Sequence, residues 1–259
     1  IHFAAFKAVG ESVEKPLDYY ENNIHTLVYL LQELGKKPKA HFIFSSSCTV
    51  YGQAKQMPIT ENAPVQQAMS PYGNTKQIGE EIVHDASKVS NVQSVLLRYF
   101  NPIGAHHSAA IGELPIGVPQ NLVPFITQTA IGLRKELSVF GNDYPTPDGT
   151  CIRDYIHVVD LAKAHVVALQ RLIEKKNLSK IETFNLGTGT GSSVLEVITA
   201  FEKVSGKKLP YKIVGRREGD ITSAYANTDK ANNVLGWKAQ STLEESLASA
   251  WKWEQKIRS

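Results

Sequence analysis

The sequence predicts an α/β fold in which a doubly wound parallel sheet is joined to a smaller α/β domain. Short apolar strands alternate with amphipathic helices over much of the chain, a pattern that requires crossover connections between parallel strands. The composition is that of a globular protein, since 42% of the 259 residues are hydrophobic and 20% are charged. A Pro- and Gly-rich stretch over residues 101–149 interrupts the alternation, as expected of an insertion that builds a pocket.

The first half of the chain contains three candidate strands. The first is the apolar run Ile1–Ala5, and the second is His41–Phe44, which follows a helix predicted over Pro16–Leu34 from its apolar spacing. Another amphipathic helix is predicted over Thr75–Ser87. The β-branched and aromatic residues of Val92–Phe100 predict the third strand.

The second half continues the pattern with one strand and four helices. Glu182–Leu186 is the predicted strand. The helices are predicted over Leu122–Leu133, Asp154–Lys175, Ser192–Val204 and Leu243–Lys256. We expect residues 1–100 and 153–190 to form the larger domain, and residues 101–152 and 191–259 the smaller one.

Charge and cysteine content exclude several classes of protein. The 28 basic and 25 acidic residues leave a net charge of +3, too balanced for a nucleic-acid-binding or membrane-surface protein. No apolar run approaches the roughly 18 to 20 residues of a membrane helix. Cys48 and Cys151 are the only cysteines, so we expect reduced thiols and a cytoplasmic location. Because no Cys/His spacing typical of a metal site occurs, no metal is predicted.

A tyrosine and a lysine four residues apart on a helix share one face, so that the ammonium can stabilise a phenolate. Two such pairs occur, Tyr72 with Lys76 and Tyr51 with Lys55. Gly52 favours a turn within the second pair, so its side chains need not converge. Ser70 and Pro71, in contrast, predict a helix start immediately before Tyr72.

The serines Ser45, Ser46 and Ser47 stand at the carboxyl end of a predicted strand, where ligands bind in open α/β sheets. A hydroxyl from Ser47 could hold or pass a proton to Tyr72. The residues alone leave two interpretations open, a catalytic Tyr–Lys pair and a chance pair on a helix.

A set of longer runs carries a family resemblance. In chain order, they are Lys7–Ser12, Phe44–Ser47, Thr49–Gly52, Ser70–Gly73, Arg98–Pro102, Gly141–Pro145, Arg153–His157 and Arg216–Asp220. Together they resemble the UDP-glucose 4-epimerase family of the extended short-chain dehydrogenases, over essentially the whole chain and in the family's order. The resemblance implies a Rossmann-like larger domain that binds NAD, a smaller domain that binds a nucleotide sugar, and a homodimer.

The resemblance also implies roles for individual residues. Tyr72 becomes the catalytic base, Lys76 its electrostatic partner and Ser47 the hydrogen-bonding relay. The implied NAD contacts are Phe3, Ala4, Lys7, Asn22, Tyr72, Lys76 and Phe100. The implied contacts to the UDP-hexose are Lys7, Ser47, Tyr72, Asn101, Asn121, Leu122, Arg153, Arg217, Asp220 and Ala224.

Several of these residues also have structural interpretations. Arg153 and Asp154 could simply open the following helix, because an acid near a helix start is favourable. Arg216 and Arg217 could be a solvated surface pair.

The family's glycine-rich phosphate loop does not occur in this chain. The candidate Gly187–Gly191 lacks the third glycine of the dinucleotide fingerprint, so we interpret it as a turn followed by a helix capped at Ser192 or Ser193. We therefore expect that a segment of roughly 70 to 80 residues precedes Ile1 in the parent enzyme. The chain alone is expected to hold NAD weakly or not at all.

Substrate range is predicted from a single position. In the family, a bulky aromatic four residues after the Asp of the Arg-Glu-Gly-Asp run narrows the pocket near the sugar's C2 substituent. Ala224 stands there, followed by Tyr225, so we expect UDP-GlcNAc and UDP-GalNAc to be tolerated beside UDP-glucose and UDP-galactose.

Two alternatives to an epimerase are open. A nucleotide-sugar 4,6-dehydratase would carry an acid pair directly after the serines, where Cys48 and Thr49 stand; a decarboxylase of the same superfamily is the related possibility. The other alternative is an inactive fragment or a non-catalytic Rossmann-like binding protein.

Overall fold

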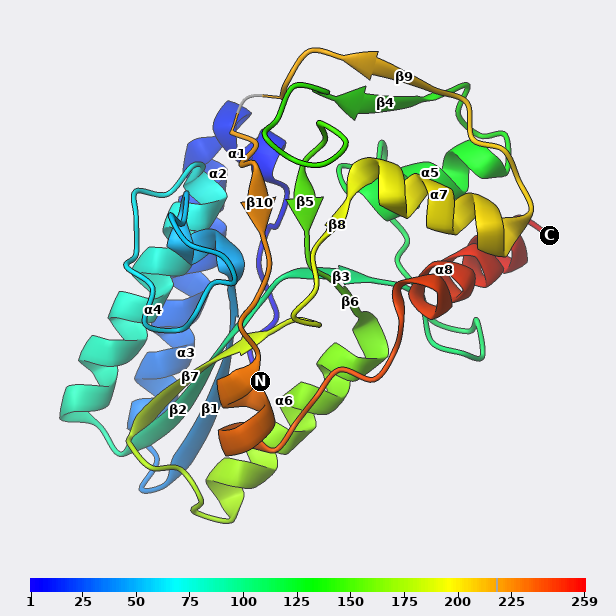
Figure 1. The fold of residues 1–259 in the computed structure, drawn as a ribbon. Helices are drawn as coiled ribbons and strands as arrows, with labels where there is room; N and C mark the ends of the chain where they lie inside the picture. Colours follow the sequence, from blue (N-terminus) through cyan, green and yellow to red (C-terminus); the bar gives the residue numbers. More distant parts are fainter. Residues whose placement is uncertain (218) are drawn as a thin grey trace. The chain divides into compact units, whose positions relative to one another are not determined.

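The computed structural model describes residues 1–217 and 219–259. The chain divides into two compact units, each built from several stretches (Figure 1). The first unit contains residues 1–99, 163–186 and 227–238, and the second contains residues 100–162, 187–226 and 239–259.

The first unit is built on a parallel three-stranded sheet in the order β1–β2–β7. These strands are Ala40–Ser47, Val92–Tyr99 and Ile181–Leu186. In register, Ser45, Ser46 and Ser47 of β1 lie beside Leu97, Arg98 and Tyr99 of β2. The predicted α/β fold with a parallel sheet is therefore confirmed.

Helices of the first unit cover this sheet and support its carboxyl edge. They are α1 (Val9–Glu14), α2 (Pro16–Tyr20), the π-helix η1 (Glu21–His25), α3 (Thr26–Gly35), the 3-10 helix η2 (Cys48–Tyr51), α4 (Pro71–Val89) and the π-helix η3 (Ala231–Leu235). Apolar residues of α3 and α4 pack against β1 and β2 in a core that includes Leu27, Phe42, Phe44, Val83 and Leu96. This burial fixes α4 on the sheet.

Among its described residues, the second unit contains three small sheets, the helices α5 (Leu122–Ala130), α7 (Val194–Ser205) and α8 (Leu243–Arg258), and the first turn of α6 (Val158–Ile173). Its strands are β3 (Asn101–Ile103), β4 (Leu137–Phe140), β5 (Ile152–Arg153), β6 (Tyr155–His157), β8 (Ser192–Ser193), β9 (Tyr211–Val214) and β10 (Ser223–Ala224). They pair as β10–β5–β8, β3–β6 and β4–β9. The helices α5, α7 and α8 share a core that includes Ile126, Phe201 and Trp251.

Helix α6 (Val158–Ile173) belongs to both units by sequence. The helix predicted from Asp154 therefore begins four residues too early, because Tyr155–His157 pairs with Asn101–Ile103 as a strand. The run Ile1–Ala5 also departs from its prediction, since it pairs with β1 only at the bridge between His2 and Phe44.

The compact units differ from the predicted domains at residues 100, 153–162, 187–190 and 227–238. Residues 153–162 lie in the second unit, where β6 pairs with β3. Residues 227–238 lie in the first, where Arg171 donates to Val234 O at 2.9 Å and Asn227 N to Ile59 O at 2.7 Å. Such backbone contacts carry no sequence pattern of their own.

Candidate functional site

The amino end of α4 places Tyr72 on the first turn of a helix. Ser70 is the N-cap, and its hydroxyl accepts a hydrogen bond from Gly73 N at 3.1 Å, while Pro71 occupies the first helical position. Tyr72, Lys76 and Glu80 then follow at intervals of four residues and share one helix face.

The face of α4 that carries Tyr72 meets the carboxyl end of β1. Ser47 lies close enough to Tyr72 to lower the pKa of its phenol, and the Lys76 ammonium donates to Ser45 O at 2.9 Å. Lys76 Nζ lies 5.8 Å from the centroid of the Tyr72 ring. Ser47, Tyr72 and Lys76 are 6%, 8% and 6% exposed, so the structure brings the three predicted catalytic residues together in a nearly dry site.

Burial dominates the ionisation of both groups. It raises the pKa of Tyr72 above its usual value, and the hydrogen bond with Ser47 only partly opposes the rise. Burial lowers the pKa of Lys76 to about 8, while the charge of Glu80 acts to raise it. In the protein by itself, the phenol is therefore protonated at neutral pH and needs a further positive charge to act as a base.

The second predicted pair does not converge. Tyr51 is fully buried in η2 and donates to Asn185 Oδ1 at 2.6 Å, whereas Lys55 is exposed. A shared spacing therefore has different outcomes on a helix and across a turn.

The residues predicted to touch NAD in the first unit lie on its amino-terminal segment and η1. Phe3 is 58% exposed with its ring 4.6 Å from that of His165, and Ala4 and Lys7 are exposed as well. Asn22 donates from Nδ2 to Asn23 Oδ1 at 2.9 Å. Phe100, at the start of the second unit, is 4% exposed.

The donor set at Lys76 fits an oxygen-rich ligand such as the ribose of a dinucleotide. An ammonium carries three N–H donors, and Ser45 O is the one acceptor that Lys76 meets within residues 1–217 and 219–259. The hydroxyl of Thr49, close to α4, is buried with no hydrogen-bond partner. A site with spare buried donors is what a polyhydroxylated ligand completes.

The second unit brings together three of the residues predicted to bind the nucleotide sugar. Asp220 accepts from Arg217 at 2.8 and 3.2 Å, and Arg153 Nη2 lies 3.6 Å from Asp220 Oδ1. Two guanidinium groups thus converge on one carboxylate, an arrangement suited to a diphosphate beside a hydroxylated ring. Glu218, within the same run, lies outside the described residues.

Arg216 and Arg217 differ in their surroundings. Arg216 pairs with exposed Asp143 at 2.7 Å and stacks 4.1 Å from the Tyr144 ring, as a solvated surface residue does. Arg217 instead joins the cluster with Arg153 and Asp220.

The remaining substrate-site residues are dispersed in the second unit. Asn101 opens β3 and donates its backbone N–H to Asp154 O at 2.9 Å. Asn121 is the exposed N-cap residue of α5, and Leu122 packs partly against the core. Ala224 is 2% exposed in β10, next to half-buried Tyr225.

Asp154 has a role that the sequence did not indicate. Its carboxylate accepts backbone N–H bonds from Thr188, Gly189 and Ala226 at 2.8, 3.2 and 3.1 Å. Burial raises the pKa of this carboxyl, opposed by those hydrogen bonds. The interpretation of Asp154 as a helix-start acid is wrong, because α6 begins only at Val158.

The turn Gly187–Gly191 connects β7 to β8 and the α7 cap, as predicted. Ser193 is the N-cap of α7 and forms a capping box with Glu196. A Cβ at Gly187 would lie 2.2 Å from Asp154 Oδ2, so a glycine is required for the carboxylate to approach. The backbone N–H groups of Thr188 and Gly189 in this turn therefore donate to the protein's own Asp154 carboxylate.

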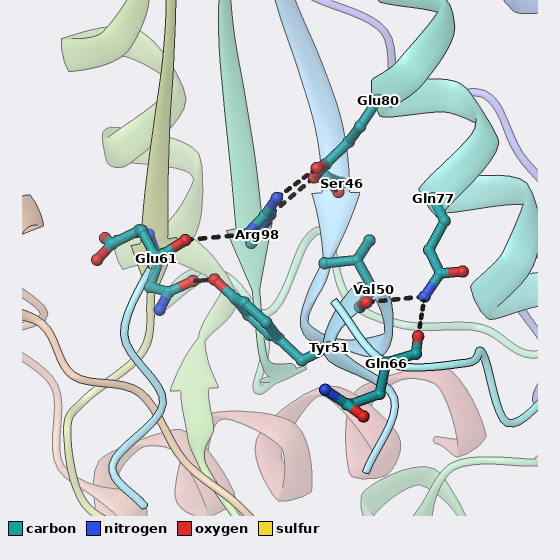
Figure 2. Close-up of polar contacts among 9 residues, drawn as sticks. Ser46, Val50, Tyr51, Glu61, Gln66, Gln77, Glu80 and Arg98 are labelled. Carbon is teal, nitrogen blue, oxygen red and sulfur yellow. Dashed lines mark hydrogen bonds and ion pairs between the residues drawn. The ribbon is translucent and has the colours of Figure 1, made fainter. Parts of the chain in front are cut away.

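A buried network around Arg98 was also missed (Figure 2). Arg98 donates to both carboxylate oxygens of Glu80, at 2.9 and 2.5 Å, and Ser46 Oγ donates to Glu80 Oε1 at 2.5 Å. The Arg98 guanidinium also lies 4.8 Å from the centroid of the Tyr51 ring. A basic residue directly after the apolar run Val95–Leu97 of a predicted strand was the available signal.

Known proteins with the same sequence pattern and fold identify the family. The profile of a family described as GDP-mannose 4,6 dehydratase matches residues 1–250. UDP-glucose 4-epimerase 2 of Arabidopsis thaliana is 53% identical over 254 residues, which are 98% of this chain and 72% of that protein. The chain belongs to the UDP-glucose 4-epimerase family.

Solved structures of epimerases agree with this assignment. The UDP-glucose 4-epimerase of Stenotrophomonas maltophila, with bound NAD and formylated UDP-arabinopyranose, is 48% identical with a TM-score of 0.95, covering 99% of this chain and 76% of that one. The Bifidobacterium longum UDP-glucose 4-epimerase, in complex with NAD+ and UDP, is 49% identical with a TM-score of 0.93 and the same coverage.

The epimerase family fits the site better than the dehydratase description. A 4,6-dehydratase needs an acid and a base for proton transfer at C5 and C6. Directly after Ser47, η2 offers Cys48 and Thr49 and no carboxylate. Within residues 1–217 and 219–259, no cluster of metal-ligating side chains occurs, and no helix is both long and apolar enough to cross a bilayer.

Proposed function

We propose that this chain carries the catalytic residues of an NAD-dependent epimerase that interconverts UDP-galactose and UDP-glucose at C4. The observation that carries the proposal is the buried contact of Tyr72 with Ser47, with Lys76 one helical turn away on the same face. The family assignment supports the substrate class, and the epimerases of S. maltophila and B. longum were solved with NAD.

Tyr72 accepts the proton of the C4 hydroxyl, and Ser47 forms hydrogen bonds that align this hydroxyl with the phenol. NAD, when bound, supplies a hydride acceptor for C4 and a positive charge that favours the phenolate. Lys76 adds its own positive charge and offers its spare N–H donors to the cofactor's ribose. After rotation of the 4-keto sugar, return of the same hydride to the other face of C4 would complete the inversion, so net redox would be zero.

NAD binding is assigned to Phe3, Ala4, Lys7, Asn22 and Phe100 together with Tyr72 and Lys76. Nucleotide binding is assigned to Arg153, Arg217 and Asp220, with Asn101, Asn121 and Leu122 as further contacts. Rotation of the 4-keto sugar requires tight binding of the nucleotide and weak binding of the hexose.

Tolerance of N-acetylhexosamines is a finer proposal that rests on Ala224. Ala224 is 2% exposed and Tyr225 is half-buried. The room for the C2 substituent of the sugar beside β10 therefore depends on the size of both side chains. Turnover of UDP-GalNAc at a rate comparable to that of UDP-galactose is expected, and Ala224→Tyr should remove it selectively. Turnover of UDP-galactose alone by the unaltered protein would contradict the proposal.

A homodimer and a cytoplasmic location complete the proposal, supported by the family resemblance and by two cysteines that form no disulfide bond. Sedimentation of the purified protein with NAD should give twice the chain mass. A monomer at micromolar concentration would contradict the dimer.

Because weak NAD binding is expected, the proposed function is tested by incubating the protein with NAD at saturating concentration and UDP-galactose, and measuring UDP-glucose. Tyr72→Phe should lower turnover by about 10² to 10⁴-fold, while Tyr155→Phe, a matched control with the same 8% exposure, should keep it. Equal loss in both variants, or no UDP-glucose from the unaltered protein, would contradict the proposal.

A further inference from the structure

Glu80 occupies the position one turn beyond Lys76 on the face of α4 that carries Tyr72. Three consecutive serines of β1 meet three consecutive positions of this face. Ser47 lowers the pKa of Tyr72, Ser45 O accepts from Lys76, and Ser46 donates to Glu80. These contacts hold the end of β1 against the first turns of α4. Glu80 is the last of the three α4 residues that face the serines.

Arg98 fixes Glu80 from the neighbouring strand. The two side chains form a bidentate pair, 10% and 8% exposed, through bonds of 2.9 and 2.5 Å. Tyr51 closes the other side of the guanidinium, and Glu61 O lies 3.5 Å from Arg98 Nη1. Figure 2 shows this pair between α4 and the sheet, with Ser46 against the same carboxylate. A bidentate pair restricts both rotation and register, which one surface ion pair does not do.

The charges around Lys76 single out Glu80. Glu80 is the one carboxylate whose charge acts on Lys76 within the described residues. His2, in the amino-terminal segment, has its pKa lowered by burial and by Lys76, so it is neutral at neutral pH. The phenols Tyr19, Tyr72 and Tyr99 around the site have pKa values raised by burial and are neutral too.

We propose that Glu80 is a positioning residue of the epimerase site: held by Arg98 and Ser46 one helical turn beyond Lys76 on the face that carries Tyr72, it places a fixed negative charge beside the lysine ammonium. Glu80 touches neither hexose nor cofactor in this account, and acts through Lys76. The inference rests on the proposed function only because that function gives Lys76 its role beside the catalytic Tyr72.

Three variants separate charge from architecture. Glu80→Gln keeps the shape and an acceptor for Ser46 but removes the negative charge, whereas Glu80→Asp keeps the charge. The double variant Glu80→Gln with Arg98→Met removes both charges, which guards against unfolding caused by an unpaired buried guanidinium.

The readout is the titration of Lys76, followed by the Nζ chemical shift in 15N-lysine-labelled protein, with Lys76→Met to assign the signal. In Glu80→Gln, Lys76 should titrate roughly one pH unit lower than in the unaltered protein, and in Glu80→Asp close to it. The double variant should show a smaller fall, because it also loses the positive charge of Arg98. The alkaline limb of the kcat pH profile should move by the same amount.

An unmoved Lys76 titration in either folded variant, or a fall in kcat without movement of the limb, would overturn the proposal. So would the failure of both variants to fold, because the pair would then serve the fold alone. If the unaltered protein turned over no UDP-galactose while Lys76 titration still moved, the proposed function would fail and the effect of Glu80 would stand.

Discussion

The two clusters of candidate site residues differ in their contact with water. Around Tyr72, the side chains of Ser45, Ser46, Ser47, Lys76 and Glu80 are each less than 9% exposed. Around Asp220, the Arg217 side chain is 46% exposed, and Arg153 and Asp220 are 16% and 12% exposed. In the buried first cluster, gain or loss of one proton changes the electrostatic energy strongly. The second cluster depends on ion pairs whose attraction water and salt weaken.

This difference matches two kinds of work. Proton transfer requires pKa values near the working pH. Burial brings the pKa of Lys76 to about 8, whereas the buried Tyr72 phenol still needs a further positive charge to ionise. Binding a diphosphate requires positive charge that can exchange one anionic partner for another. We therefore expect changes in the first cluster to alter kcat and pH dependence, and changes in the second to alter KM and salt dependence.

The largest effect is expected from Tyr72→Phe. Loss of the proton acceptor should lower kcat by about 10² to 10⁴-fold, with little change in KM. A coupled assay of UDP-glucose formation measures both constants. A raised KM with an unchanged kcat would show that Tyr72 acts in substrate binding, and would contradict the proposed difference between the clusters.

Lys76 should make stability depend on pH. Its pKa is lowered to about 8 in the folded protein and is near 10.5 when unfolded, so the unfolded chain binds more protons between these values. The free energy of unfolding contributed by Lys76 should therefore rise with pH across this window, by on the order of 3 kcal/mol. Urea unfolding at pH 7.5 and 10 measures the rise.

Lys76→Met should remove that rise. Lys88→Met, on an exposed position of the same helix, is the matched control and should keep it. Parallel curves for the unaltered protein and Lys76→Met would show that the ammonium is not destabilised by burial.

Arg217→Ala should act on KM. Loss of a charge-assisted contact to a diphosphate is expected to raise the KM for UDP-galactose about tenfold, with kcat within about twofold. Arg216→Ala, which removes an exposed pair with Asp143, should change KM less than about twofold. Equal effects in the two variants would remove the distinction between these neighbours.

The smallest effect is expected from salt. Raising NaCl from 50 to 500 mM should raise KM by roughly threefold through screening of the exposed cluster. The buried site should respond less, so kcat should stay nearly constant. A kcat that fell in parallel with the rise in KM would contradict the contrast.

The Tyr72 site could be predicted because its signals are local. A helix start at Ser70 and Pro71 orients Tyr72, the four-residue spacing adds Lys76, and the strand end supplies Ser47. Glu80 could not be predicted in the same way, because a glutamate four residues after a lysine is typical of a solvated helix face. Its partner Arg98 lies on another strand, and only the fold brings them together.

Asp154 shows a different limit. A strand of three residues, Tyr155–His157, carries too little periodicity to separate it from the helix that follows. The carboxylate then binds amides from Thr188, Gly189 and Ala226, which are distant in sequence. Long-range backbone contacts of this kind leave no spacing pattern.

The most direct test of the proposed chemistry follows deuterium placed at C4 of UDP-galactose. If the C4 hydrogen leaves as hydride and returns within one binding event while Tyr72 handles only the hydroxyl proton, the UDP-glucose formed keeps the deuterium at C4. Appearance of that deuterium in water, or incorporation of solvent hydrogen at C4, would contradict the account.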